Sequence, residues 1–420
     1  MTAPRRAAAT PPLLRDLNER TVLDAIRRRA PISRAEISRT VGISKPTVSG
    51  ALQSLLEAGL VRKAEANSGG PSYGATFFEP VPDAALALGL DLGARFLRGA
   101  ICDLPGRVCA RQDIELAGAD VRGVLELATN LRDRLIAVCG LDAEAIHGAV
   151  VGVPGVVLPD GDEVHLAENV HGLEGMPIGA ELERRLGMRV TVENDVNLAA
   201  VGERWRGVAR GVEDFVFLSI GTGLGAGVVL HGELHRGNHG AAGEVDYALG
   251  GGIERQSDPC AEALSAYAQE LAAPPGAGTT LAPPFDVRSI FAAARAGDRM
   301  GRAVVEEEAR RIALHIAPIA AVADVELVVV GGGIGANGDL LLAPVRALLK
   351  ELLPYPPRVE VSSLGDAAVL SGALAIGREA ALDGVFENRR TVEGRSSRTP
   401  ANLPRRSEDK TRMSREGFAH

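Results

Sequence analysis

From residue 84 to residue 384 the chain alternates segments typical of buried strands with segments typical of amphipathic helices, which limits the fold to the α/β class. Two series can be distinguished, and each opens with a strand that runs into a glycine turn, "ALALGLDLG" and "DFVFLSIG". Glycine accounts for 50 of the 420 residues, above the usual ~7%, and no collagen-like period explains it. We therefore expect two duplicated lobes with a ligand cleft between them.

One strand end carries an unusual group of polar residues within "VTVENDVNLAA". These residues are Glu193, Asn194, Asp195 and Asn197. Polar groups at the end of a buried strand are costly unless they bind something. A carboxylate near a hydroxyl can hold it or deprotonate it, so the pattern predicts polyol binding. Alternatively, or at the same time, Asp195 serves as the N-cap of a helix that starts at Val196.

The segment 13–80 has the pattern of a helix-turn-helix followed by a wing. Ser33 and Glu36 stand at capping-box spacing, so a second helix is expected to begin at Ser33, and Gly42 suits the turn that follows it. Ser44 is expected to cap the third helix, which leaves short polar side chains on its outer face. The predicted DNA-contacting residues are Ser44, Lys45, Thr47, Ser49 and Gln53. The stretch "GLVRKAEANSGGPSYGATFFEP" predicts a two-stranded wing with a Gly-Gly turn.

Charge is distributed unevenly along the chain. Residues 1–63 hold twelve Lys or Arg against five Asp or Glu, and residues 386–420 hold nine against five, although the whole chain carries a net charge of −8. A basic head on an acidic body suits contact with nucleic acid, because phosphates attract the head and repel the body. Ordinary solvated charges are the alternative explanation.

Composition also sets the expected boundaries. Residues 1–12 and 388–420 are rich in Pro, Ala, Arg or Ser and are expected to be disordered. Two prolines in "FFEPVPDAA" mark a linker between residues 80 and 84. The four cysteines have no metal-like or disulfide-like spacing, and no apolar run approaches the ~18 residues of a membrane span. The expected location is the cytoplasm.

Five segments, in the same order as in the family, make the chain resemble the ROK family (repressors, open reading frames and kinases) from about Leu17 to Ala380. They are "GLDLGARFLRGAICD", "GVPGVV", "NVHGLEGMPI", "END" and "SIGTGLGAGVVLHGELHRGNHGAAGEVDYALGGG". The resemblance implies a winged helix-turn-helix at 13–80 joined to a two-lobed sugar-kinase-like body at 84–384. By the same resemblance, the body is expected to have the actin-like, hexokinase-type (ribonuclease H-like) ATPase fold.

The resemblance also implies roles for individual residues. The implied sugar ligands are Asn169, Asn194, Asp195 and Glu244, and Asp195 is the catalytic base only if the protein is a kinase. The implied phosphate or nucleotide-like loops contain Asp91, Gly93, Gly221, Thr222, Gly223 and Gly225. The chain departs from the family at Ala94 and Arg95, where Gly-Thr is usual, and at Leu173, where a Trp is common.

A zinc site implied by the family is expected to be absent. Asp246 and Tyr247 stand where the family has Gly-His, and Cys260 is alone where the family has a cysteine cluster. One thiolate cannot provide a four-ligand zinc site. We therefore expect no metal and no required cofactor, with ATP and Mg²⁺ needed only under the kinase alternative.

Two main functions follow from these features. The first is a sugar-responsive transcriptional regulator, expected to be a repressor, which binds operator DNA with its head and a carbohydrate effector in its body. It is expected to be a homodimer or a higher homo-oligomer, with no membrane partner. The second is an ATP-dependent hexose kinase that retains a DNA-binding head, and the sequence favours it less. A third option is a body without ligand that serves only for dimerisation.

Overall fold

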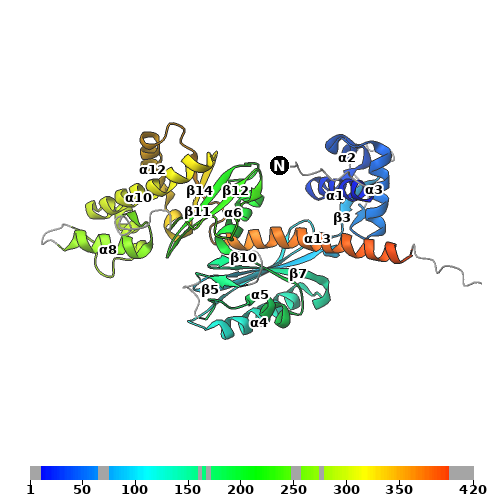
Figure 1. The fold of residues 1–420 in the computed structure, drawn as a ribbon, viewed down its shortest axis with the longest axis horizontal. Helices are drawn as coiled ribbons and strands as arrows, with labels where there is room; N and C mark the ends of the chain where they lie inside the picture. Colours follow the sequence, from blue (N-terminus) through cyan, green and yellow to red (C-terminus); the bar gives the residue numbers. More distant parts are fainter. Residues whose placement is uncertain are drawn as a thin grey trace, which may run out of the picture.

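The computed structural model describes residues 11–64, 75–158, 163–166, 172–246, 257–273 and 279–396. Figure 1 shows a small helical head, two lobes that each contain a sheet, and one long helix, α13 (Ala368–Ser396), which runs from between the lobes to the head. Within these ranges, none of the helices combines the length and the hydropathy that crossing a bilayer requires.

The head is a three-helix unit with a small sheet. Its elements are α1 (Pro11–Arg29), β1 (Ile32–Ser33), α2 (Arg34–Val41), α3 (Lys45–Glu57), β2 (Val61–Lys63) and β3 (Phe77–Pro80). The predicted capping box is confirmed, because the Ser33 side chain accepts from Glu36 N and the Glu36 carboxylate accepts from Ser33 N. Helix α2 itself begins one residue after the predicted start. The predicted Gly-Gly turn of the wing lies outside the described residues.

Two features of the head differ from the sequence prediction. Helix α1 begins at Pro11, inside the segment expected to be disordered, because Pro is well tolerated in the first turn of a helix. The wing sheet has a third strand, since β1 pairs with β3 at Ile32–Phe78 while β2 pairs with β3 from the other side. The extra strand ties the start of α2 to the wing.

The N-terminal lobe is built on a five-stranded sheet. In chain order its elements are β4 (Leu86–Leu92), β5 (Phe96–Cys102), β6 (Val108–Glu115), α4 (Val121–Cys139), β7 (Ile146–Val153), β8 (Val156–Val157), β9 (Val164–His165), α5 (Ile178–Leu186) and β10 (Val190–Asn194), with 3₁₀ turns at Pro82–Ala84 and Ala143–Ala145. The strand order is β10-β7-β4-β5-β6, in which β4, β5 and β6 are antiparallel and β7 and β10 run parallel to β4. Helices α4 and α5 cover one face with an aliphatic core.

The C-terminal lobe repeats this topology. Its elements are α6 (Asp195–Arg206), β11 (Phe215–Ile220), β12 (Leu224–Leu230), β13 (Glu233–Leu234), α8 (Ala261–Ala272), α9 (Val287–Arg295), α10 (Arg299–Ala323), β14 (Leu327–Gly331), α11 (Gly332–Gly335), α12 (Gly338–Leu352) and β15 (Arg358–Val361), followed by a 3₁₀ turn at Gly365–Ala367. The order β13-β12-β11-β14-β15 again joins three antiparallel strands to two parallel ones. The predicted duplication is therefore confirmed.

Helices α6 and α13 cross between the two sheets. Leu198 of α6 packs with Val150 and Ala373, on the side of the N-terminal lobe. The neighbouring Ala199 and Ala200 belong to the cluster that covers β11 and β14 of the C-terminal lobe. Glycine permits the close crossing, because a Cβ at Gly372 of α13 would lie 1.9 Å from the Leu198 carbonyl oxygen. Both lobes therefore share one pair of helices.

The far end of α13 passes beyond the predicted boundaries. The helix continues to Ser396, past residue 384, where the body was expected to end, and into the segment from 388 that was expected to be disordered. An established helix extends at low cost through residues such as Glu and Arg, which are good helix formers. Low apolar content alone was therefore an incomplete guide to the end of the folded chain.

Candidate functional site

The predicted DNA-contacting side chains gather at the start and on the outer face of α3. Ser44 is the N-cap of α3, and its Oγ accepts from Thr47 N and lies 2.8 Å from Thr47 Oγ1. Lys45 is exposed, and the Ser49 hydroxyl bonds to the Lys45 carbonyl. Gln53 is exposed one turn later and donates to Glu57. The opposite face, with Val48, Leu52 and Leu55, is buried.

Arg34 belongs to the same surface but was not among the predicted contacts. It is the first residue of α2, it is exposed, and its Nη1 donates to Ser49 Oγ at 3.1 Å. A helix-turn-helix packs the start of its first helix beside its recognition helix. The position of Arg34 directly after the capping Ser33 was the sequence signal that could have identified this residue as a candidate DNA contact.

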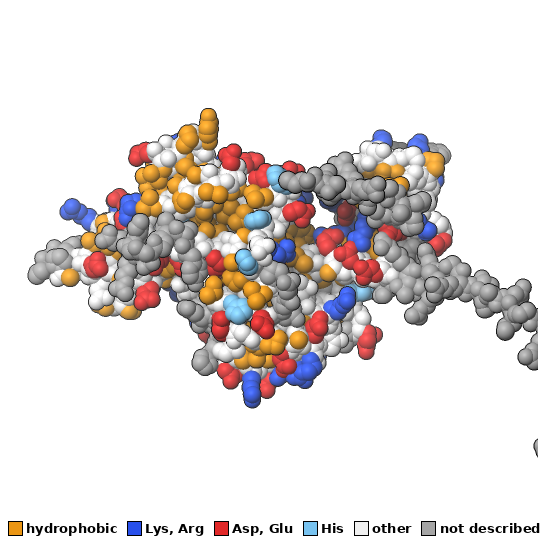
Figure 2. Space-filling view, viewed as in Figure 1, with side chains coloured by type: hydrophobic (Ala, Val, Ile, Leu, Met, Phe, Trp, Pro, Cys, Tyr) orange, Lys and Arg blue, Asp and Glu red, His pale blue; other side chains and the backbone are white. Residues whose placement is uncertain are grey.

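The surface charge of the head differs from that of the body. Figure 2 shows Lys and Arg side chains on the top of the head, whereas the face of the body in view carries Asp and Glu together with Lys and Arg side chains. In the wing, Arg62 is paired with Glu79 at 2.7 Å, while Lys63 is exposed. The contrast between head and body therefore rests on the counts of charged residues along the chain.

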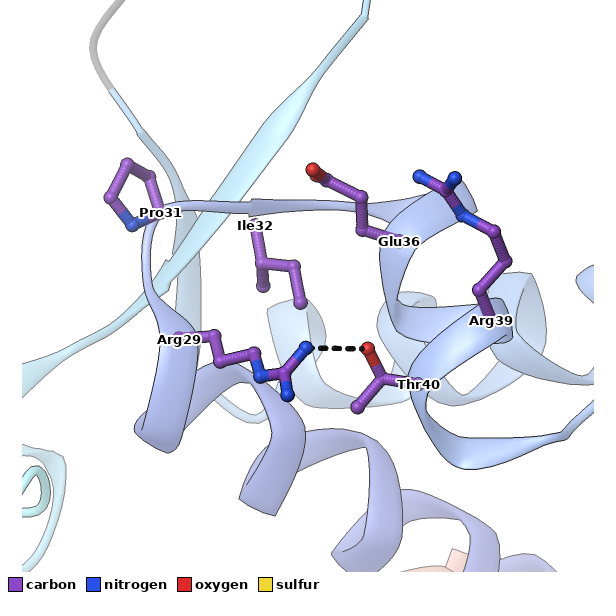
Figure 3. A pocket seen from close by; sticks show the side chains of 6 residues that line it. All are labelled: Arg29, Pro31, Ile32, Glu36, Arg39 and Thr40. Atoms are coloured by element: carbon purple, nitrogen blue, oxygen red, sulfur yellow. Dashed lines mark hydrogen bonds between the residues drawn. The ribbon is translucent and has the colours of Figure 1, made fainter.

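A surface cavity of about 510 Å³ lies on the head, between the end of α1 and helix α2. Figure 3 shows its lining side chains, among them Ile32, Arg29 and Thr40, with Arg29 donating to Thr40 Oγ1 at 3.4 Å. The carboxylate of Glu36 already accepts hydrogen bonds from Ser33, and these bonds lower its pKa. The polar groups that could hold a polyol lie instead in the body, at the end of β10.

At the end of β10, the polar run separates into supporting and accessible side chains. Glu193 and Asn197 are buried, and Glu193 Oε1 accepts from Asn197 Nδ2 at 3.0 Å. Arg236, on the loop after β13, donates to Glu193 Oε2 at 2.7 Å. Glu193 therefore fastens this loop to the strand. Glu193 belonged to the polar run predicted to bind a polyol but not to the implied sugar ligands, and Arg236 was not identified from the sequence.

The N-cap of α6 is Asn194, not Asp195 as the alternative interpretation had it. Asn194 Oδ1 accepts from Asn197 N, and its Nδ2 donates to the Gly155 carbonyl. Asp195 is the first helical residue, one position later. A backbone change from strand to helix between these two residues decides which side chain can reach the third helical N–H. Asn194 remains a predicted sugar ligand with both of its polar atoms already engaged once.

Asp195, the first residue of α6, has an unusual electrostatic environment. Its Oδ1 accepts from Val196 N, and its side chain is recessed but not sealed from solvent. Burial raises the pKa of Asp195 to about 7, and the charges of Asp91 and Glu244 add to the increase. Such a carboxyl group can hold a hydroxyl or take its proton near neutral pH.

Glu244 lies close enough to Asp195 for their charges to interact. Burial, and then the charge of Asp246, raises the pKa of Glu244. Its loop is pinned to β12, because Ala226 N donates to the Gly243 carbonyl and a Cβ at Gly243 would lie 1.8 Å from the Ala226 oxygen. Asp195 and Glu244, two of the predicted sugar ligands, therefore lie within electrostatic range of each other.

The predicted second phosphate loop has two parts with different surroundings. Gly221, Thr222 and Gly223 form an open turn, in which Gly221 N donates to the Gly223 carbonyl and Thr222 is exposed. Gly225 packs on the start of α6, since a Cβ there would lie 3.1 Å from a Val196 methyl group. The turn keeps bare backbone toward solvent, while Gly225 has a packing role.

The predicted first phosphate strand is occupied by an ion pair. Asp91 is the penultimate residue of β4 and is buried, and Arg98 of β5 donates to its Oδ2 at 3.0 Å. Gly93 N donates to the Phe96 carbonyl in the turn that follows. Arg95, at a position where the family has a hydroxyl residue, is exposed and paired with Glu115. The sequence interpretation did not anticipate Arg98, although a charge inside the apolar strand "FLRGAIC" was a visible signal.

Two residues named in the sequence analysis, Asn169 and Tyr247, lie outside the described residues. Leu173, at the position where a Trp is common, is completely buried in the core of the N-terminal lobe. In the described part of the chain, no three His, Cys, Asp or Glu side chains are arranged to hold a metal ion.

The head is joined to α13 by contacts that no local sequence pattern announced. Arg27 of α1 donates to Glu379 at 2.9 Å, and Arg20 pairs with Asp383. The Arg20 guanidinium also stacks over the Phe386 ring at 4.7 Å. The side chains Ala381, Leu382 and Phe386 share one buried cluster with the core of the head. The helix that packs on α6 therefore also forms part of the head.

Comparison with known proteins matches both parts of the chain. A family model described as ROK family matches residues 87–380. A second model, described as MarR family, matches residues 16–70, which cover the helix-turn-helix and the start of the wing.

Curated relatives include both regulators and enzymes. A xylose repressor from Caldicellulosiruptor bescii is 27% identical over 387 residues, which cover 87% of this chain and 96% of the relative. A glucokinase from Streptomyces coelicolor is 28% identical over 320 residues, which cover 70% of this chain and 98% of the relative. The repressor therefore matches along the head as well as the body.

Solved structures give the same division. A ROK family transcriptional regulator, described as a homologue of the Escherichia coli MLC protein, superposes with a TM-score of 0.74 at 23% identity, covering 91% of this chain and all of that one. A ROK family glucokinase from Streptomyces griseus, solved with glucose and AMPPNP, has a TM-score of 0.60 at 26% identity and covers 70% of this chain and 99% of its own. The chain, with a MarR-type winged helix-turn-helix before a sugar-kinase-like body, belongs to the ROK family.

Proposed function

We propose that this protein is a DNA-binding transcriptional repressor whose affinity for its operator is controlled by a carbohydrate bound in the body. The head binds DNA through Lys45, Ser49 and Gln53 on the exposed face of α3. The carbohydrate binds beside Asp195 and Glu244, with Asn194 and Asn169 as further ligands from the resemblance. The repressor relative, which matches along both parts of the chain, supports this assignment.

One structural observation carries the proposal. Helix α13 packs on α6 at a glycine crossing, and α6 begins with Asp195. The same α13 contributes Leu382 and Phe386 to the core of the head. A ligand that draws the lobes together around Asp195 moves α6 and α13, and the movement changes the position of the head. A ligand shifts the equilibrium only by its differential affinity for the two arrangements.

The test uses the full chain and fluorescent DNA from its own upstream region. Operator binding is measured by anisotropy with and without a panel that includes xylose, glucose and their phosphates, and sugar binding is measured by calorimetry. We expect Lys45→Ala to weaken DNA binding while sugar binding persists. Asp195→Asn should do the reverse, with a roughly 10- to 100-fold loss of sugar affinity, because hydrogen bonds to a charged acceptor contribute ~1.5–3 kcal/mol. Sugar binding that never alters DNA binding would refute the proposal.

The functional unit is proposed to be at least a homodimer acting in the cytoplasm. A single recognition helix reads only a few base pairs, and two heads on an inverted repeat gain affinity through effective concentration. Light scattering at micromolar concentration should therefore give at least twice the 43.8 kDa mass of one chain. A monomer both with and without operator DNA would contradict this part of the proposal.

A second candidate function is an ATP-dependent hexose kinase. One observation favours it, namely the pKa of about 7 that burial gives to Asp195, because a general base works best near the operating pH. An assay of ADP release over a hexose panel separates the two. Under the repressor proposal no metal and no nucleotide is required, and turnover abolished by Asp195→Asn would support the kinase instead.

A further inference from the structure

Three charged side chains lie next to one another across the antiparallel half of the N-terminal sheet. The register of β4 and β5 places Asp91 opposite Arg98, and that of β5 and β6 places Arg98 opposite Asp113. Arg98 Nη1 lies 3.0 Å from Asp91 Oδ2, and its Nε lies 3.6 Å from Asp113 Oδ2. Directly opposed residues on one face of a sheet are close enough to pair. The strand register therefore fixes the guanidinium between two carboxylates.

The inner pair of this row is shielded from water. The side chains of Asp91 and Arg98 are 4% and 17% exposed. Asp113 is more open and is held from the other side by Arg111, at 2.9 and 3.0 Å. Removing one partner of a buried pair leaves an uncompensated charge, which is strongly unfavourable. Arg98 is therefore held in place beside Asp91.

Asp91 interacts electrostatically with two carboxylates of the C-terminal lobe. Its charge is felt by Asp195 at the start of α6. In turn, Asp91 feels the charge of Asp366, in the 3₁₀ turn before α13. In phosphate-transferring sites Mg²⁺ is held by one or two carboxylates together with the substrate phosphates, so a carboxylate that is already paired with a fixed positive charge is a poor ligand for it.

We propose that Arg98 determines ligand specificity by acting as a permanent counter-ion for Asp91, which closes this side of the cleft to a metal-bound nucleotide. A divalent cation at Asp91 would have to displace a shielded guanidinium and would then lie beside its positive charge. The glucokinase of this family was solved with AMPPNP, but the residues present here do not fit such a group. The inference concerns only the nucleotide side of the cleft, so it stands whether or not a sugar controls DNA binding.

The experiment compares the full-length wild type with variants at one position. Mn²⁺ in the presence of ADP is the probe, and the bound fraction is read from the loss of the free Mn²⁺ resonance. Arg98→Met keeps the length of the side chain without its charge, Arg98→Gln keeps a donor toward Asp91, and Arg98→Lys keeps the cation. We expect no saturable Mn²⁺–ADP binding by the wild type or by Arg98→Lys. The two neutral variants should bind Mn²⁺–ADP at least tenfold more tightly than the wild type does, a difference of ~1.4 kcal/mol.

Asp91 is tested by the double variant Asp91→Asn, Arg98→Met, which should lose the gained binding. Circular dichroism and thermal melting establish which variants are folded, and either neutral variant is sufficient for the comparison. Saturable Mn²⁺–ADP binding by the wild type that Asp91→Asn abolishes would overturn the proposal. Folded neutral variants that gain no binding would overturn it equally, because something other than the Arg98 charge would then exclude the probe.

Discussion

Arg27 and Glu379 are 352 positions apart in the chain, yet Arg27 Nη2 donates to Glu379 Oε1 at 2.9 Å. Arg27 is almost fully buried, whereas Glu379 is half exposed, and its carboxylate also accepts from Arg378. The charge of Arg27 helps to hold the pKa of Glu379 below its usual range, although burial opposes this. The pair joins the last turn of α1 to α13, so it connects the head to the helix that packs on α6.

We predict that Glu379→Ala weakens the transmission of sugar binding to the head. A partly exposed ion pair contributes only ~0–1 kcal/mol to stability, so the variant should fold and bind sugar normally. Its operator affinity should change less on addition of sugar than that of the wild type, as measured by anisotropy. The matched control is Glu326→Ala, which removes an exposed pair with Arg358 in the C-terminal lobe. Equal sugar responses in the two variants would contradict the role of the contact.

The glycine crossing predicts two opposite outcomes on one helix. Gly372→Ala places a methyl group 1.9 Å from the Leu198 oxygen, whereas a Cβ at Gly384 meets nothing within 4 Å. Gly372→Ala should destabilise the protein by about 1–3 kcal/mol or more, because the packed helices must separate. Gly384→Ala should be neutral or should stabilise α13 by up to ~1 kcal/mol through helix propensity. Urea unfolding of both variants is the measurement, and equal midpoints would show that the crossing is not tight.

The pKa of about 7 at Asp195 predicts a pH dependence. A carboxyl group whose pKa is higher in the folded state binds protons more tightly when folded, so its stabilising contribution is complete below about pH 4. It is lost as pH rises toward 7. Asp195→Asn should therefore raise the melting temperature relative to wild type more at pH 8 than at pH 5. A calorimetric difference that is the same at both pH values would contradict the raised pKa.

The ionisation of Asp195 should also affect ligand binding. An ionised carboxylate accepts stronger hydrogen bonds than a protonated one. Sugar affinity measured by calorimetry is thus expected to increase from pH 6 to pH 8 in the wild type and to remain nearly constant in Asp195→Asn. An affinity that falls over this range in the wild type would show that the protonated form binds the sugar.

Arg34 is predicted to contact operator DNA. It is exposed beside Ser49 at the start of α2, where a guanidinium can reach a phosphate. Arg34→Ala should weaken operator binding and reduce the slope of log affinity against log salt by about 1. Arg122→Ala, which changes an exposed arginine on α4 of the body, is the control. An unchanged salt slope in Arg34→Ala would exclude the phosphate contact.

The amino-acid sequence by itself determined the local elements. The capping box of Ser33 and Glu36, the cap at Ser44 and the left-handed Gly42 depend on hydrogen bonds and backbone angles within a few residues. The alternating strands and glycine turns also indicated two lobes, which the identical strand orders confirm. Such features are predictable because the interacting groups are close in the chain.

The tertiary structure decided which distant groups meet. A shift of one residue at the boundary of β10 and α6 gave the cap to Asn194 and left Asp195 as the first helical residue. Strand register set Arg98 against Asp91, and helix packing brought Arg27 to Glu379. Each outcome depends on how sheets and helices pack, and packing is governed by the summed burial of many side chains rather than by any local pattern. The sequence therefore predicted a DNA-binding head and a sugar-binding body, and only the tertiary structure showed how the two are connected.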